Sequence, residues 1–205
     1  MQIVSSYSKG TRFLASIDED WARLVSEVGE CTHKTRTERE PYEALIRAIA
    51  YQQLHAKAGG AILVKLLALF GSESFPDAKQ LLDTDVSILR TCGFSARKIE
   101  TIRAVAQGCL TGLVPCRAQA DSMTDEELIH RLTSLKGIGR WTVEMLLIYT
   151  LERIDVLPAD DFGVREGYRK LKSMSVAPAK KEMERLGIRW SPYRTLAAWY
   201  LWRLK

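Results

Sequence analysis

The sequence predicts an all-α protein, and three observations lead to that class. Residues typical of helix starts and ends recur along the whole chain, with short connections between them. The alternation typical of a strand is confined to residues 154–157, which is too short to build a sheet. Hydrophobic residues make up 46% of the 205 residues and charged residues 27%, as in an ordinary globular protein that can bury a core. We therefore expect about ten helices.

In the first half of the chain, five helices are expected from their boundary residues. Asp is a preferred N-cap, Pro suits the first helical position, and Gly commonly follows the last one. The expected helices cover residues 19–28 after Asp18, 41–54 from Pro41, 56–70 before Gly71, 85–92 before Gly93, and 95–108 from Ser95.

The second half continues in the same way. Thr124 and Glu127 have the spacing of a capping box, which predicts a helix over 125–134. The other expected helices cover 140–152, the stretch from Asp160 or Asp161 to about 171, 178–186 from Pro178, and 192–203 after Ser191.

Composition narrows the function classes. The formal net charge is +5, which favours a polyanionic partner only weakly. The longest nearly apolar run, 58–72, contains Lys65 and is too short to span a bilayer, and no secretory signal opens the chain. The four cysteines lack metal-site spacing, so we expect reduced thiols, no membrane and a cytoplasmic location.

The most informative stretch is Leu-Lys-Gly-Ile-Gly-Arg-Trp-Thr at residues 135–142. Gly137 and Gly139 join two expected helices and allow the chain to turn tightly, with Ile138 between them as an apolar anchor. Backbone amides at the start of the following helix favour a phosphate, and Arg140 adds a positive charge. The stretch is therefore either a structural helix–helix turn or a sequence-independent clamp on a DNA backbone.

A second feature is the acidic pair Asp160-Asp161, which follows Gly139 after one expected helix and a short extended segment. Asp161 lies 22 residues beyond Gly139 (161 − 139 = 22). An ionised carboxylate in a cleft can stabilise the positive charge that develops at a sugar C1′, or it can orient a water molecule. Helix capping alone is the alternative interpretation, and one residue can do both.

Together, these stretches resemble the helix-hairpin-helix DNA glycosylase superfamily, and most of all its alkylation-repair branch, the 3-methyladenine DNA glycosylase II family. The resemblance covers most of residues 35–205 and rests on four further segments. These are Ala-Ile-Ala-Tyr-Gln-Gln-Leu at 48–54, Leu-Arg-Thr-Cys-Gly-Phe-Ser at 89–95 with Lys98, Leu-Pro-Ala-Asp-Asp-Phe at 157–162, and the helix from Pro192 to Trp202.

This resemblance implies two helical lobes within one domain, 1–205, with the hairpin at about 125–152 and an active-site cleft between the lobes. It implies that Asp161 is the catalytic aspartate, because it directly precedes an aromatic residue. The backbones of Gly137 and Gly139 would hold a DNA phosphate beside Arg140. Gln53 and Leu54 would lie at the turn that fills the gap left by an extruded nucleotide.

The resemblance also implies a base-stacking pocket and a cation site. Trp141, Trp202 and Phe162 would stack on a cationic base, although packing in the core is the alternative for each of them. The main-chain carbonyls of Thr133, Leu135 and Ile138 would hold Na⁺ or K⁺, and no other cofactor is required. For Lys98, Arg194 and His55, which could lie near DNA, a solvated surface residue is the alternative.

One position separates the subclasses of this superfamily. Members that also nick the strand carry a lysine two residues after the second hairpin glycine, where this sequence has Trp141. The enzyme is therefore expected to be monofunctional, and the resemblance implies that it removes alkylated purines from double-stranded DNA. A monomer is the default expectation. The alternatives are a non-catalytic helix-hairpin-helix module and a glycosylase for another damaged base.

Overall fold

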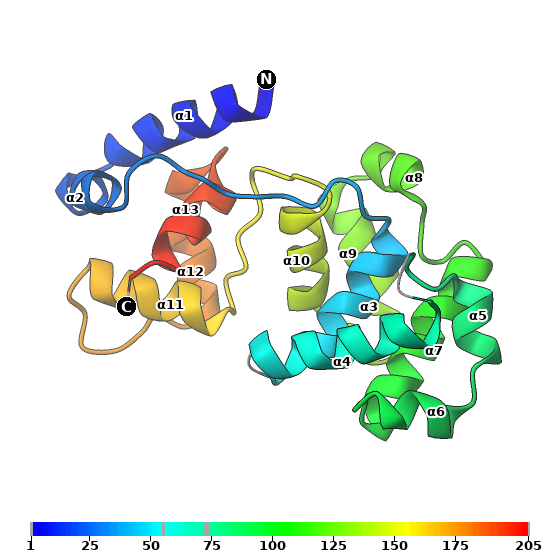
Figure 1. Ribbon diagram of the computed structural model, residues 1–205. Coiled ribbons are helices and arrows are strands. Elements are labelled where there is room, and N and C mark those ends of the chain that lie inside the picture. The colour runs from blue at the N-terminus through cyan, green and yellow to red at the C-terminus, as the bar shows by residue number, and fades with distance from the viewer. Residues whose placement is uncertain (1, 55, 72–73, 205) are drawn as a thin grey trace. The chain divides into compact units, whose positions relative to one another are not determined.

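The structure is a computed structural model that describes residues 2–54, 56–71 and 74–204. All regular structure in these ranges is helical, without a strand, which confirms the predicted class. In the same ranges, no helix is long and apolar enough to cross a membrane. The chain divides into two compact units (Figure 1). Unit 2 is the continuous segment Arg36–Leu151, and unit 1 combines the segments before and after it.

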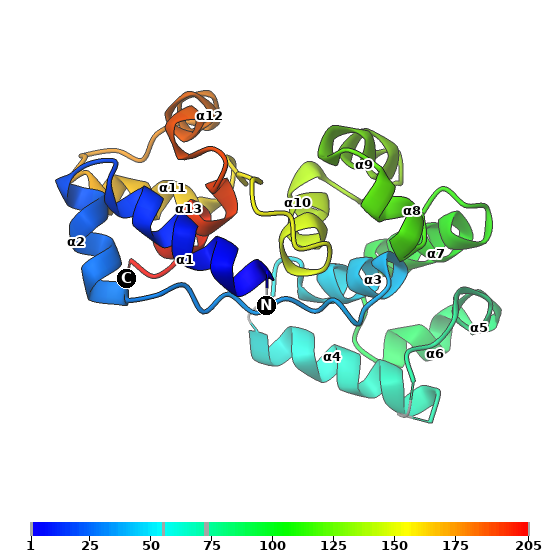
Figure 2. The ribbon, with the colours of Figure 1, turned by 90° about the horizontal axis from the view of Figure 1, so that it is seen from above.

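Unit 2 carries eight of the described α-helices, arranged around α3 and α7. These are α3 (Pro41–Tyr51), α4 (Ala56–Leu69), α5 (Ala78–Asp83), α6 (Val86–Thr91), α7 (Ala96–Leu110), α8 (Arg117–Ser122), α9 (Asp125–Thr133) and α10 (Arg140–Tyr149). Helix α3 contacts α4, α7 and α10, and α10 also contacts α9 (Figure 2). The fully buried residues Ile49 of α3 and Ile102 of α7 belong to this interior.

Unit 1 is built from both ends of the chain. Its helices are α1 (Gln2–Ala15), α2 (Glu19–Val28), α11 (Phe162–Leu171), α12 (Lys180–Gly187), the 3₁₀ turn Ile188–Trp190, and α13 (Arg194–Leu201). Helix α13 contacts α1, α2 and α11. The hydroxyl of Tyr200 on α13 lies 3.0 Å from Thr11 Oγ1 and donates to the carbonyl of Gly29 at 2.8 Å. The two ends of the chain thus form one core.

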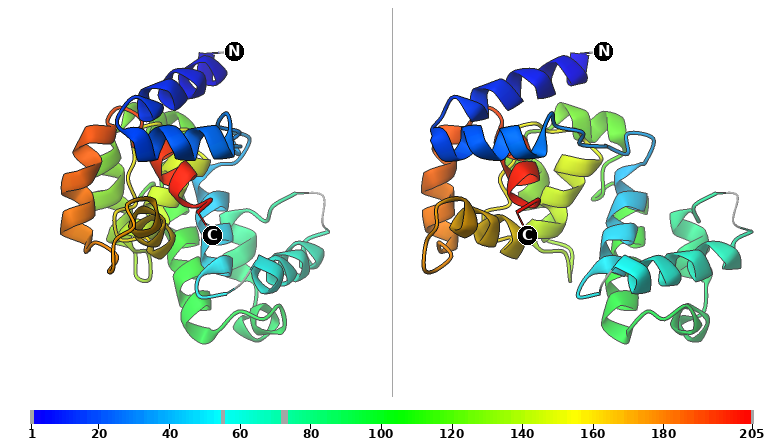
Figure 3. Two further views of the ribbon diagram at one scale, coloured as in Figure 1. Left: turned by 90° about the vertical axis from the view of Figure 1, so that its left-hand side faces the viewer. Right: turned by 60° about the vertical axis from the view of Figure 1, so that its left-hand side comes forward.

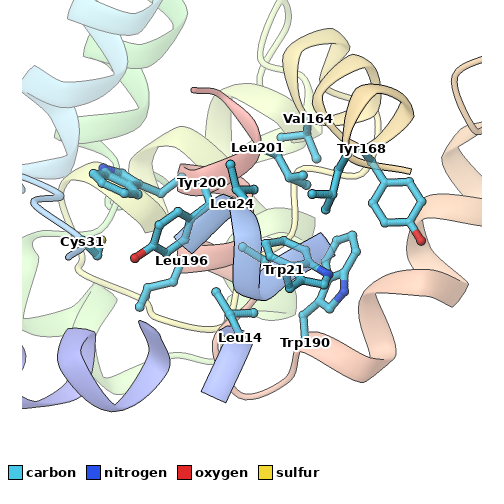
Figure 4. Packing of buried hydrophobic residues seen from close by; sticks show 14 of the residues in the cluster. Leu14, Trp21, Leu24, Cys31, Val164, Tyr168, Trp190, Leu196, Tyr200 and Leu201 are labelled. Carbon is cyan, nitrogen blue, oxygen red and sulfur yellow. The ribbon is translucent and has the colours of Figure 1, made fainter. Parts of the chain in front are cut away.

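That core is dominated by large side chains. Trp21 of α2 packs edge-on against Trp190, with ring centroids 5.4 Å apart. Leu14, Leu24 and Leu196 fill the space around these rings (Figure 4). Because α11 belongs to the same cluster, the core also fixes the helix that begins after Asp161.

Each of the ten predicted helices is confirmed, with differences at their ends. The predicted helix 41–54 ends at Tyr51, because Gln52 has an extended ψ of 127° and Gln53 a positive φ of 57°. The predicted helix 140–152 ends at Tyr149. Three helices were not predicted: the long α1 at the start of the chain and the six-residue helices α5 and α8.

Candidate functional site

The two-glycine stretch in unit 2 forms the predicted hairpin between α9 and α10. Thr124 and Glu127 make the expected capping box at the start of α9. The turn closes when the Ile138 N–H donates to the Leu135 carbonyl at 3.1 Å. Both of these side chains are buried. The hairpin is therefore anchored by its apolar residues, while Gly137 and Gly139 lie at the surface.

The two glycines serve different purposes. Gly137 has a φ of 88°, and a Cβ placed there would lie 2.1 Å from Thr101 Oγ1 of α7. Both the backbone conformation and this close approach exclude a side chain at that position. Gly139 has an ordinary φ of −95° as the N-cap of α10, and its Cβ would meet nothing within 4 Å. Gly139 is thus not needed for packing, and it leaves open space beside the start of α10.

Arg140, predicted to contact a phosphate, is part of an ion-pair network. Its guanidinium lies 2.6 Å from a carboxylate oxygen of Glu126 on α9 and 3.0 Å from one of the buried Glu144 on α10. The hydrogen bond to Glu126 is the main cause that raises the pKa of Arg140. Arg140 therefore links the two helices of the hairpin, and its contact with DNA stays a prediction.

A polar pocket of about 130 Å³ joins the hairpin to the turn after α3. Its lining residues come from three segments that are distant in the sequence: Gln52, Gln53, Ser95, Arg97, Lys98, Thr101 and Gly137. Gln53 is exposed on this turn, and Leu54 beside it is 41% exposed. The structure thus brings the predicted wedge turn and the first hairpin glycine to one pocket. His55 lies outside the described residues.

The first turn of α7 gives this pocket its positive charge. Lys98 Nζ donates to the carbonyl of Ala50 at 3.0 Å, at the end of α3, and burial lowers the pKa of Lys98. Sequence reasoning singled out Lys98 but missed Arg97 and Thr101. Thr101 lies one helical turn after Arg97, and this spacing on an expected helix is the signal that could have found it.

Asp161 lies in unit 1 as the N-cap of α11. Its Oδ1 accepts the Val164 N–H at 2.9 Å and the Trp202 indole N–H at 2.8 Å. Asp160 is exposed and lies 3.7 Å from the guanidinium of Arg165. The sequence left open which aspartate caps the helix, and the structure gives this position to Asp161.

The segment that leads to Asp161 is held against the start of α13 rather than forming a strand. Arg194 donates from its side chain to both carboxylate oxygens of Asp155, at 2.7 and 3.0 Å. Burial raises the pKa of Asp155, but the hydrogen bonds from Arg194 and Ser191 outweigh this effect and keep it below its usual value. Thr195 Oγ1 accepts the Val156 N–H at 3.0 Å. Arg194, named as a phosphate contact, is thus engaged with Asp155.

The three aromatic residues predicted to stack on a base are distributed over both units. Trp141 is on α10 of unit 2 and is 40% exposed. Phe162 is at the start of α11 in unit 1 and is 80% exposed. Trp202 in unit 1 is half-buried and bonded through its N–H to Asp161. Packing in the core therefore does not account for Trp141 or Phe162.

The predicted cation site lies in the hairpin. Of its three carbonyl ligands, that of Leu135 already accepts the Ile138 N–H, and a carbonyl oxygen has a second lone pair for a cation. Over the described ranges, no cluster of His, Cys, Asp or Glu could hold a metal ion. The Na⁺ or K⁺ site at Thr133, Leu135 and Ile138 stays a prediction.

Comparison with known proteins gives consistent matches. Residues 46–192 match the family model of the HhH-GPD superfamily base excision DNA repair protein. The chain is 46% identical to DNA-3-methyladenine glycosylase 1 of Schizosaccharomyces pombe, over 98% of this chain and 89% of that protein. It is 40% identical to the alkylbase DNA glycosidase-like protein mag2 of the same yeast, over 98% and 94%.

The fold agrees with these matches. The structure of the S. pombe 3-methyladenine DNA glycosylase in complex with abasic DNA superposes with a TM-score of 0.90 and 46% sequence identity, covering 95% of each chain.

Proposed function

We propose that this chain, which belongs to the HhH-GPD superfamily of base excision DNA repair proteins, is a monofunctional DNA glycosylase. Its substrates are alkylated purines in double-stranded DNA. The observation that carries the proposal is the carboxylate of Asp161, which two N–H donors hold at the start of α11. A carboxylate that N–H donors hold in a fixed position can stabilise a sugar cation that forms beside it.

The hairpin and the polar pocket beside Gly137 would bind the DNA. The amides beside Gly137 and Gly139 would hold a backbone phosphate, and the cations Arg97 and Lys98 would neutralise a neighbouring one. The glycosidic bond of a stacked base is inaccessible, so the target nucleotide must leave the helix. The exposed turn at Gln53 and Leu54 would occupy the space that the nucleotide leaves.

The chemistry is a hydrolysis. A purine methylated at N3 or N7 carries a positive charge, so it leaves without a strong general acid. The C1′–N bond breaks, its electron pair goes to the purine, and Asp161 stabilises the sugar cation that forms. Water adds to C1′ and loses its proton, which leaves a free base and an abasic site. Water is the only co-reactant, so no cofactor is required.

The exposed ring of Phe162, which follows Asp161 in unit 1, would hold the cationic base by stacking and cation–π attraction. Trp141 occupies the position where strand-nicking relatives carry lysine, so no covalent intermediate is expected. We expect a monomer with a cytoplasmic location, associated with the nucleoid if the source is bacterial.

The proposal is tested by incubating methylated duplex DNA with the wild type, Asp161→Asn and Asp160→Asn, and measuring the released bases by chromatography. We expect the wild type and Asp160→Asn to release 3-methyladenine and 7-methylguanine. Asp161→Asn should bind DNA normally but lose release by at least about 100-fold, because an amide cannot neutralise the sugar cation. Asp160→Asn is the matched control, since its carboxylate is exposed at the same helix start.

The outcomes separate the alternatives. DNA binding without release of any base by the wild type would favour a non-catalytic helix-hairpin-helix module. Preferential release of uracil or an oxidised purine, in competition with methylated duplexes, would assign the site to another damaged base. Near-normal release by Asp161→Asn would remove the catalytic role of this residue.

A further inference from the structure

Trp202, at the C-cap of α13, meets Asp161 edge-on rather than with its ring face. Its indole Nε1–H donates to Asp161 Oδ1 at 2.8 Å, across 41 residues of sequence. The same oxygen accepts the Val164 N–H at 2.9 Å. Two donors from two helices therefore fix one oxygen atom of this carboxylate.

This contact depends on two glycines of α11. A Cβ on Gly163 would lie 2.8 Å from Trp202 Cδ1, 3.2 Å from its Nε1 and 3.1 Å from Asp161 Oδ1. A Cβ on Gly167, one turn further, would lie 2.2 Å from the carbonyl oxygen of Leu201. Helices α11 and α13 lie side by side in unit 1 (Figure 3). The sequence thus keeps side chains off the face where Trp202 approaches Asp161.

We infer that Trp202 is a positioning residue for the carboxylate of Asp161 and acts through its indole N–H, a role that rests on the proposed glycosylase function. A hydrogen bond from the helix start alone leaves a carboxylate free to rotate about its remaining bonds. A second donor on the same oxygen fixes the plane of the group before the substrate arrives. A stacking role would instead depend on the area of the ring face.

Two substitutions at this position separate the two roles. Trp202→Phe keeps a broad aromatic face and loses the N–H. Trp202→His keeps a ring N–H, because its Nε2 occupies the same place in a five-membered ring as the indole Nε1, but offers a smaller face. We therefore compare both variants with the wild type for single-turnover release of 7-methylguanine and for the dissociation constant of methylated duplex DNA.

If Trp202 positions Asp161, Trp202→Phe lowers the single-turnover rate by about 10- to 100-fold, the range for a lost hydrogen bond to a charged group. The DNA dissociation constant stays within about twofold, because a positioning bond matters to the chemical step rather than to binding. Trp202→His should be at least about fivefold faster than Trp202→Phe. Gly163→Ala, which displaces the indole, should reproduce the slow release of Trp202→Phe.

The opposite ranking, with Trp202→Phe as fast as or faster than Trp202→His at equal folded fraction, overturns the inference in favour of stacking. The inference is also overturned if a rise in the DNA dissociation constant of Trp202→Phe accounts for its entire loss of base release. Wild type that releases no methylated base would instead refute the proposed function itself. Gly163→Ala keeps the test decisive if a Trp202 variant fails to fold, because fast release by Gly163→Ala also contradicts the positioning role.

Discussion

A single atom, Oδ1 of Asp161, accepts the hydrogen bonds that hold this carboxylate in place. Two neighbouring aspartates were candidates, and the family resemblance favoured Asp161 because an aromatic residue directly follows it. The structure distinguishes them physically, because Asp161 caps α11 and Asp160 is exposed. The sequence could not reveal the bond from Trp202, since donor and acceptor are 41 residues apart and the direction of an indole N–H depends on helix packing.

The proposed monofunctional chemistry rests on one residue, Trp141. The lone pair of its indole nitrogen belongs to the aromatic system, so the ring cannot attack C1′ or form a Schiff base. We expect borohydride to trap no covalent adduct when wild-type protein is incubated with methylated duplex DNA and then resolved by denaturing electrophoresis. A superfamily member with lysine at this position is the positive control. A trapped adduct that forms with the wild type would contradict monofunctional chemistry.

Among the helices, the strongest predictions came from local chemistry. The Thr124–Glu127 capping box and the Asp18 and Ser95 caps act within three residues, so sequence spacing suffices to find them. Helix α5 was missed although Asp77 and Gln80 form a capping box of the same kind. Helix α1 shows no comparable start signal, and its contacts with α2 and α13 are tertiary, which no local pattern reveals.

The hairpin between α9 and α10 allows a prediction that separates folding from binding. Gly137→Ala should lower the midpoint temperature of thermal unfolding. The alanine would have to adopt a φ of 88°, and its Cβ would lie 2.1 Å from Thr101 Oγ1. The expected cost is at least about 2 kcal/mol of unfolding free energy. Gly139→Ala should lower the unfolding free energy by less than about 1 kcal/mol, the cost of Ala at an N-cap, since its φ is ordinary and its Cβ would meet no atom within 4 Å.

DNA affinity completes this comparison. Gly139→Ala places a methyl group beside the amides that would hold a phosphate, so we expect weaker binding of duplex DNA by the folded variant. Calorimetry and fluorescence anisotropy on the same samples measure both quantities. Unchanged DNA affinity of Gly139→Ala would show that Gly139 does not contact DNA. An unchanged unfolding midpoint of Gly137→Ala would contradict the steric argument.

At the scale of the whole molecule, the two compact units do not follow one another along the chain. The sequence predicted helical lobes but could not show that unit 1 joins both ends of the chain, with Arg36–Leu151 between them. The contact between Thr11 and Tyr200 spans 189 residues, and Trp21 packs on Trp190. Such pairs leave no periodic signal in the sequence, because each partner appears only as another apolar or aromatic position on its own helix.

This topology predicts that damage to the N-terminal helices will destabilise the unit that carries Asp161. Trp21→Ala removes a fully buried side chain from the unit 1 core and should cost about 3–5 kcal/mol of unfolding free energy. Phe162→Ala is the matched control, because its side chain in the same unit is 80% exposed and its loss should cost less than about 0.5 kcal/mol.

Hydrogen exchange followed by mass spectrometry can locate this loss. Compact units of one chain can open separately, so Trp21→Ala should speed exchange in α1, α2, α11 and α13 and leave α3, α7 and α10 protected. Base release should then fail at lower temperature than in the wild type, while binding by the hairpin persists. Equal loss of protection in α3 and α7 would show instead that the chain unfolds as one cooperative body. In that case the N-terminal helices would support the hairpin as strongly as they support Asp161.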